Sequence, residues 1–179
     1  MVRLPFLSLV FLALCMENVH GQSSFPYQWI GEYEGEMIIA SAGRPNDTVP
    51  LDFQLLEIVP DSIWSYVMNY HSVKWGEITK DYRYVRAKKG DDINFIFDEQ
   101  NGIVMELTFM NDCFYGMYEV SDMIFINSFR KQGDTLFFEL FAGPSSNPKI
   151  TSATEGDEVF EAKSYKPTLV QSVVLRRKQ

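Results

Sequence analysis

The stretch INFIFDEQNGIVMELTFMNDCFYGMYEV, residues 93–120, predicts the fold of this chain most clearly. Three of its runs alternate apolar or aromatic residues with polar ones, a period of two that indicates half-buried strands. These runs cover residues 93–97, 103–109 and 113–120. Asn101-Gly102 is the strongest hairpin signal, because a type I′ turn needs positive φ at both central residues. Since Asn111-Asp112 marks the next turn, we expect three successive antiparallel strands.

The same alternation continues on both sides of this stretch. It predicts further strands at residues 31–40, 49–59, 63–71, 78–88, 123–131, 135–142 and 168–177, with a shorter one at 149–154. Turn residues separate most of these runs by only a few positions, and short connections favour antiparallel neighbours. Residues 143–158 form the longest irregular region.

A sheet of nine or ten strands tends to curl and close, because closure removes its unpaired edges. No segment has the sustained apolar period of a helix, and no linker or internal repeat divides the chain. The predicted fold is therefore all-β. We expect a single antiparallel up-and-down β-barrel of about 8–10 strands over residues 22–179.

Residues 1–21 have the three parts of a secretory signal peptide. Arg3 supplies the positive charge, residues 4–16 supply the apolar part, and Gly21 is the last residue before the expected cut. The apolar part is too short to span ~30 Å of hydrocarbon as a helix. We therefore expect a protein that is secreted or periplasmic after cleavage near Gly21.

We expect different roles for the two cysteines, Cys15 and Cys113. The sequence before Cys15 resembles a bacterial lipoprotein signal, although Leu14 replaces the usual small residue, so lipid anchoring at Cys15 is an alternative. Cleavage near Gly21 leaves Cys113 alone, and no intramolecular disulfide can then form. We expect Cys113 to be a buried apolar thiol.

Charge and composition disfavour several functions. The net charge of −8 opposes binding to nucleic acid and anionic lipid, and no run of about 20 apolar residues predicts a transmembrane helix. After cleavage His71 is the only histidine, and we expect it to be a solvated residue at a strand end. The acidic run 98–102 lacks the spacing of an EF-hand loop. We expect no catalytic residue, no metal site and no cofactor.

Aromatic residues make up 15% of the chain, and many occupy alternating strand positions. Inside a barrel of this size, such rings either fill the interior or line a cavity for one small ligand. A charge in the middle of a strand, such as Arg130, could face that cavity and bind the polar end of a ligand. The candidate lining residues are Trp64, Tyr66, Tyr84, Tyr115, Tyr118 and Arg130, with plain core packing as the alternative for the aromatic ones.

The opening Trp29-Ile30-Gly31-Glu32-Tyr33-Glu34-Gly35, together with the arginines near residue 177, resembles the calycin group, the lipocalins and their relatives. The order here is Trp-x-Gly, the reverse of the usual lipocalin Gly-x-Trp, and it is similar to that of secreted bacterial β-barrel proteins. The resemblance implies a barrel with a possible ligand cavity. It also implies that Trp29 packs under Arg176 or Arg177 and closes one end of the barrel.

Two functions follow from these expectations. The first is an exported, non-catalytic barrel that binds a small apolar or amphipathic ligand. The second is a filled barrel that acts as an interaction or scaffold protein through surface loops such as residues 143–158. An outer-membrane barrel and an enzyme are further alternatives. The turns are short at both ends of the predicted barrel, which disfavours an outer-membrane barrel, and the scarcity of histidine and cysteine disfavours an enzyme.

Overall fold

The computed structural model describes residues 25–179, and every regular element in that range is a β-strand. The strands are β1 (Gly31–Ser41), β2 (Asp47–Leu55), β3 (Glu57–Val59), β4 (Ile63–Ser72), β5 (Gly76–Arg86), β6 (Asn94–Asp98), β7 (Val104–Met110), β8 (Cys113–Val120), β9 (Met123–Gln132), β10 (Thr135–Pro144), β11 (Lys149–Glu155), β12 (Glu158–Ser164) and β13 (Leu169–Arg177). The expected signal peptide and Cys15 lie outside the described residues.

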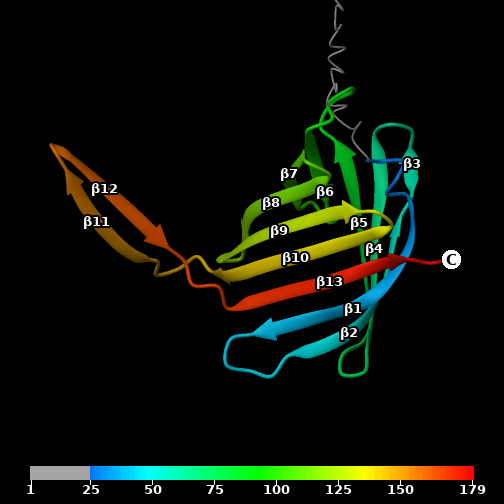
Figure 1. Ribbon diagram of the computed structural model, residues 1–179, viewed down its shortest axis with the longest axis horizontal. Coiled ribbons are helices and arrows are strands. Elements are labelled where there is room, and N and C mark those ends of the chain that lie inside the picture. The colour runs from blue at the N-terminus through cyan, green and yellow to red at the C-terminus, as the bar shows by residue number, and fades with distance from the viewer. Residues whose placement is uncertain (1–24) are drawn as a thin grey trace, which may run out of the picture.

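The strands form a closed antiparallel barrel, as the alternation of the sequence predicts (Figure 1). Neighbours follow the order β2-β1-β13-β10-β9-β8-β7-β6-β5-β4, and pairing of β2 with β4 closes the ring. The short strand β3 adds to the edge of β4, because the predicted strand 49–59 is interrupted at Leu56. The barrel thus has ten strands in the described part of the chain.

The hairpin turns differ in length. Asn111 and Asp112 both have positive φ in the β7–β8 turn, as do Ser121 and Asp122 in the β8–β9 turn, which is the pattern of a tight hairpin turn. The β6–β7 connection is longer than predicted, and its positive φ angles fall at Gln100 and Gly102. The prediction of a two-residue Asn101-Gly102 turn was wrong, because side chains from the loop organise a wider one.

Two side chains make that wider loop. The Asp98 carboxylate accepts a hydrogen bond from the backbone N–H of Gln100 at 2.7 Å. The side-chain oxygen of Asn101 accepts one from the backbone N–H of Ile103 at 2.9 Å. Short polar side chains that bond to nearby backbone groups in this way stabilise turns. The loop therefore covers residues 99–103.

Strands β11 and β12 form a separate hairpin that projects away from the barrel (orange in Figure 1). Every residue of both strands is exposed. The predicted strand at 149–154 is confirmed, whereas its partner β12 was missed. With no buried face, the hairpin has no apolar alternation from which a strand could be predicted.

An aromatic cluster fills one end of the barrel, and we call it the aromatic plug. Its members are Phe25, Trp29, Trp64, Tyr84, Phe95, Phe109 and Phe114. Phe114 lies near its centre, with ring centroids 4.4 Å from Tyr84, 4.6 Å from Phe109 and 4.8 Å from Phe25. Since the segment before β1 supplies Phe25 and Trp29, this segment is part of the core.

Arg177 fixes that segment to the end of the barrel. Its guanidinium donates hydrogen bonds to the carbonyl oxygens of Ile30 at 2.6 Å and Gln28 at 2.8 Å, and to the Tyr33 hydroxyl at 2.8 Å. It also lies 4.9 Å from the centre of the Tyr33 ring. An arginine of the last strand therefore closes the barrel, but the ring beneath it is that of Tyr33, in place of the expected Trp29.

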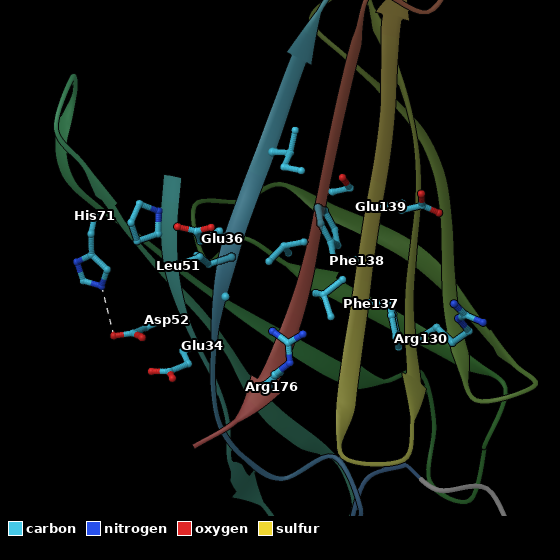
Figure 2. A pocket seen from close by; sticks show the side chains of 16 residues that line it. Glu34, Glu36, Leu51, Asp52, His71, Arg130, Phe137, Phe138, Glu139 and Arg176 are labelled. Atoms are coloured by element: carbon cyan, nitrogen blue, oxygen red, sulfur yellow. Dashed lines mark hydrogen bonds and ion pairs between the residues drawn. The ribbon is translucent and has the colours of Figure 1, made fainter. Parts of the chain in front are cut away.

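The neighbouring residue Arg176 does not take part in this closure. It lines a groove on the outer surface (Figure 2), because successive side chains of a strand point to opposite faces. Trp29 is fully buried in the aromatic plug, with ring centroids 5.6 Å from Phe114 and 5.5 Å from Phe129. The expectation was that Trp29 packs under Arg176 or Arg177, but Arg177 lies over Tyr33 and Arg176 lies at the outer groove.

Candidate ligand-binding site

The interior of the barrel is hollow on the side away from the aromatic plug. A pocket of about 410 Å³ opens there, next to the turn that joins β4 to β5. It is lined by Ile39, Val49, Tyr66, Met68, Tyr70, Ser72, Trp75, Ile78, Lys80, Tyr82, Phe97, Glu99, Tyr118, Val120, Phe125, Asn127, Phe138, Leu140 and Gln171. A volume of this size is typical of small-molecule sites.

Apart from Lys80 and Glu99, the lining is apolar with a few hydroxyl and amide groups. Tyr70 donates a hydrogen bond to the Met68 sulfur at 3.3 Å, and Asn127 donates one to the Tyr118 hydroxyl at 3.3 Å. Burial raises the pKa of Tyr70 and of Tyr118 to about 12, and it also raises the pKa of Tyr66 well above its ordinary value. These phenols are therefore neutral at physiological pH and keep their O–H donors.

Two charged residues, Lys80 and Glu99, line the mouth of the pocket. Burial raises the pKa of Tyr82. The charge of Lys80 lowers this pKa and the charge of Glu99 raises it, so both charges lie near this phenol. The Glu99 carboxylate also accepts a hydrogen bond from the Asn101 side chain at 3.0 Å. The pocket thus joins an apolar interior to a charged and hydroxylated mouth.

Local structure explains how two of the lining residues are held. A Cβ atom at Gly116 would lie 2.6 Å from the Asn127 side-chain oxygen and 2.7 Å from Leu107, so glycine leaves the space that Asn127 occupies. At the mouth, the Ser72 hydroxyl accepts hydrogen bonds from the backbone of Lys74 at 3.2 Å and Trp75 at 3.0 Å. These contacts orient the polar wall and the aromatic rim of the pocket.

The structure separates the predicted lining residues into three groups. Tyr66 and Tyr118 line the pocket. Trp64 and Tyr84 are buried in the aromatic plug. Tyr115 and Arg130 are exposed on the outer surface, so the expectation that they face the interior was wrong.

The reason lies in the sequences of β8 and β9, which are apolar on both faces. Met117 and Ile126, for example, are outward and exposed. A period of two then identifies a strand without saying which set of residues is buried. Arg130 accordingly stacks on the outward ring of Phe137, with 5.0 Å between its guanidinium and the ring centre.

Sequence reasoning missed other pocket residues. Tyr70 and Tyr82 share the faces of Tyr66 and Tyr84, so the alternation already carried the signal for them. Asn127 had no such signal, because its inward orientation depends on the space next to Gly116.

A second concavity lies on the outer surface, over β1, β2, β10 and β13 (Figure 2). This outer groove has a volume of about 840 Å³ and is open to solvent. Charges of both signs line it, namely Glu34, Glu36, Asp52, His71, Arg130, Glu139 and Arg176. Because charged groups in water are already well solvated, the groove is less suited than the interior pocket to enclosing a small apolar molecule.

At one edge of the outer groove, His71 joins three strands. Its ring nitrogens lie 2.6 Å from a Glu77 oxygen and 3.3 Å from an Asp52 oxygen, and Lys178 lies 2.7 Å from the other Asp52 oxygen. The hydrogen bond with Glu77, followed by that with Asp52, raises the pKa of His71. His71 lies at the end of β4, as predicted, where β2 closes the barrel.

Residues 25–179 contain no group of three or more histidine, cysteine, aspartate or glutamate side chains arranged to hold a metal ion. Within the same range, no helix has the length and hydrophobicity needed to cross a membrane. Cys113 is buried, as predicted.

No protein-family model and no curated protein matches this chain. Solved structures do resemble it. The S-type phycobiliprotein lyase CPES from Guillardia theta has a TM-score of 0.60 at 11% sequence identity, over 86% of this chain and 90% of that one. Rv2717c from M. tuberculosis has a TM-score of 0.51 at 12% identity, over 85% of this chain and 94% of that one.

A third similar structure is a protein of unknown function from the DUF3598 family of Nostoc punctiforme. Its TM-score is 0.56 at 9% identity over 85% of this chain, which spans only about half, 48%, of that protein. At these identities the likeness concerns the fold alone. The comparisons, together with the closed sheet, confirm the predicted calycin-like β-barrel.

Proposed function

We propose that this protein is an exported, non-catalytic β-barrel that binds a small apolar or amphipathic molecule. The observation that carries the proposal is the interior pocket of about 410 Å³, which coexists with a fully packed aromatic plug. Cores normally pack without voids of this size. A pocket that persists beside such a dense cluster is therefore explained best by a ligand that fills it.

The lining supports the chemical character of the ligand. Apolar side chains such as Phe138 and Leu140 favour an apolar body, since burial of apolar surface supplies most of the binding energy. The neutral phenols of Tyr70 and Tyr118 supply a small number of directed hydrogen bonds. The likeness to a phycobiliprotein lyase supports including a tetrapyrrole among the compounds tested.

The filled-barrel alternative has one observation in its favour. The β11–β12 hairpin exposes large apolar side chains, with Ile150 54%, Val159 70% and Phe160 53% exposed. A solvent-exposed hairpin of this kind is suited to contact with another protein. The hollow interior, however, has no role in that alternative, so we prefer ligand binding.

Native mass spectrometry of the protein purified without detergent from its own host tests the proposal. We expect an extra mass that disappears on denaturation. The denatured mass tests export separately, through cleavage near Gly21 and any lipid on Cys15. A folded, monodisperse protein without extra mass would support the filled-barrel alternative.

Tryptophan fluorescence offers an independent test with purified protein. Of the three tryptophans, Trp29 and Trp64 are fully buried in the aromatic plug, whereas Trp75 is 48% exposed at the pocket mouth. Ligand binding should change the emission of Trp75 and leave the other two unaffected. The Trp75→Phe variant is the matched control, and a ligand-dependent signal that survives in it would place binding elsewhere.

A further inference from the structure

The mouth of the interior pocket presents phenol hydroxyls and one ammonium group beside a single carboxylate. The Tyr118 oxygen accepts a hydrogen bond from Asn127, so its own O–H is directed elsewhere, and the described residues offer it no acceptor. The Tyr82 hydroxyl accepts a hydrogen bond from the Lys80 side chain, and within residues 25–179 its O–H has no acceptor either. Tyr82, Tyr118 and Glu99 all line this pocket, so the two hydroxyls and this carboxylate belong to its polar part.

Lys80 adds a positive charge to the same region. Its neighbours on β4 and β5 include Met68 and Tyr82, which also line the pocket. Among residues 25–179, Lys80 forms no ion pair, whereas other lysines such as Lys74 and Lys178 do. Its ammonium group therefore has no neutralising partner within the described part of the molecule.

Glu99 is the only acidic residue in the pocket lining, and its situation differs from that of Lys80. Its carboxylate accepts a hydrogen bond from Asn101, and the 99–103 loop holds it at the edge. Within residues 25–179, the mouth thus holds one ammonium group without an ion pair and two phenol O–H donors without an acceptor. A ligand group that complements them is an acceptor with negative charge.

We propose that the ligand is an amphipathic carboxylic acid. Its carboxylate pairs with Lys80 and accepts hydrogen bonds from Tyr82 and Tyr118, while its apolar body enters the barrel toward Phe138. This assignment rests on the proposed function, since it names the class of ligand for the same pocket.

The test compares three probes of equal chain length, each used below its micellar concentration: tetradecanoic acid, tetradecan-1-ol and tetradecylamine. Binding is followed by the emission of Trp75. We expect the acid to bind about tenfold more tightly than the alcohol, and the amine to bind most weakly. Lys80→Gln should remove the preference for the acid, and Lys80→Arg should retain most of it.

Two further variants isolate the interaction. Tyr118→Phe removes only a hydroxyl and should weaken binding of tetradecanoic acid without affecting binding of tetradecan-1-ol. Arg44→Gln is the charge-matched control, because Arg44 is exposed in the β1–β2 loop and does not line the pocket. Glu99→Gln should tighten binding of the acid, since it removes a like charge from the mouth.

The possible results separate the two proposals. Equal binding of acid and alcohol, unchanged in Lys80→Gln, would overturn the carboxylic-acid assignment and leave ligand binding intact. Tighter binding of the amine would overturn the carboxylic-acid assignment and indicate that Glu99 binds the charged end of the ligand. Absence of binding by all three probes would count against both the assignment and the proposed function.

Discussion

Arg176 and Arg177 are consecutive residues with different structural roles. Arg177 donates hydrogen bonds to two backbone carbonyls and the Tyr33 hydroxyl, whereas Arg176 lies at the outer groove. Only the planar guanidinium offers several donors in a fixed arrangement. Individual side chains thus determine how the segment before β1 attaches to the barrel.

Substitution of these two arginines tests that role. Arg177→Gln should destabilise the protein by about 2 kcal/mol, because it leaves carbonyl groups of Gln28 and Ile30 without a charged donor. Arg176→Gln is the matched control and should change stability by less than about 0.5 kcal/mol. Urea denaturation measures both. Equal effects would contradict the closure described for Arg177.

His71 gives the protein a pH-dependent contribution to stability. Hydrogen bonds with Glu77 and Asp52 raise its pKa above the ordinary 6.5. Protonated His71 therefore stabilises the folded state, fully below about pH 6.5, and this contribution is lost as the pH rises through the raised pKa. We expect wild-type stability to fall between pH 6 and pH 8 relative to that of His71→Gln. Parallel denaturation curves for the two proteins would refute the expectation.

The sequence predicts which residues form strands better than it predicts where individual side chains point. Tyr66 lies inside with the other aromatic residues of its face of β4. Tyr115 and Tyr118 are three positions apart on β8, so alternation allows only one of them, Tyr118, to face inward. Arg130 and Tyr115 were misplaced, since apolar residues occur on both faces of β8 and β9. The Gln28 and Ile30 carbonyls bound by Arg177 lie 149 and 147 positions earlier in the chain, and no local pattern reveals such a contact.

At the scale of elements, the barrel strands and the β11–β12 hairpin differ in what holds them. Each barrel strand has two paired neighbours or a buried face, whereas β11 and β12 pair only with each other and are exposed throughout. A two-stranded hairpin alone is marginally stable in water. The barrel strands were predictable because burial imposes alternation, and β12 was not because it lacks burial.

Replacement of residues 149–164 by a short Gly-Ser linker tests the independence of the hairpin. We expect the thermal midpoint to change by no more than a few degrees, because the hairpin contributes nothing to the core. Limited proteolysis of the intact protein should cut first within this hairpin. Loss of a cooperative unfolding transition in the shortened protein would show that the barrel depends on the hairpin.

At the scale of the whole molecule, one part of the barrel interior stabilises the fold and another part offers space for a ligand. The aromatic plug consists of buried rings in contact with one another, whereas the pocket is the open part of the interior. A small void lined by Tyr66, Phe129 and Phe138 separates the two regions. Substitutions in the two halves should consequently have different effects.

Two substitutions test this division. Phe114→Ala in the aromatic plug should destabilise the protein by about 3–5 kcal/mol and lower Tm by roughly 6–20 °C, with little effect on ligand affinity at low temperature. Leu140→Trp should fill part of the pocket and weaken binding at least tenfold, with little loss of stability. Calorimetric titration with tetradecanol and tetradecanoic acid, together with thermal unfolding, measures both. The reverse pattern would contradict the division.

The pairing of β1 with β13 has a consequence for how the protein is made. The first strand obtains one of its two neighbours from the last, so the ring cannot close until the ribosome has supplied residues 169–177. During synthesis β1 has β2 beside it and an unpaired edge on the other side, which is open to association with other chains. Until residues 169–177 have been made, folding therefore stops short of a closed ring, and the unfinished chain presents an edge at which wrong pairing can begin.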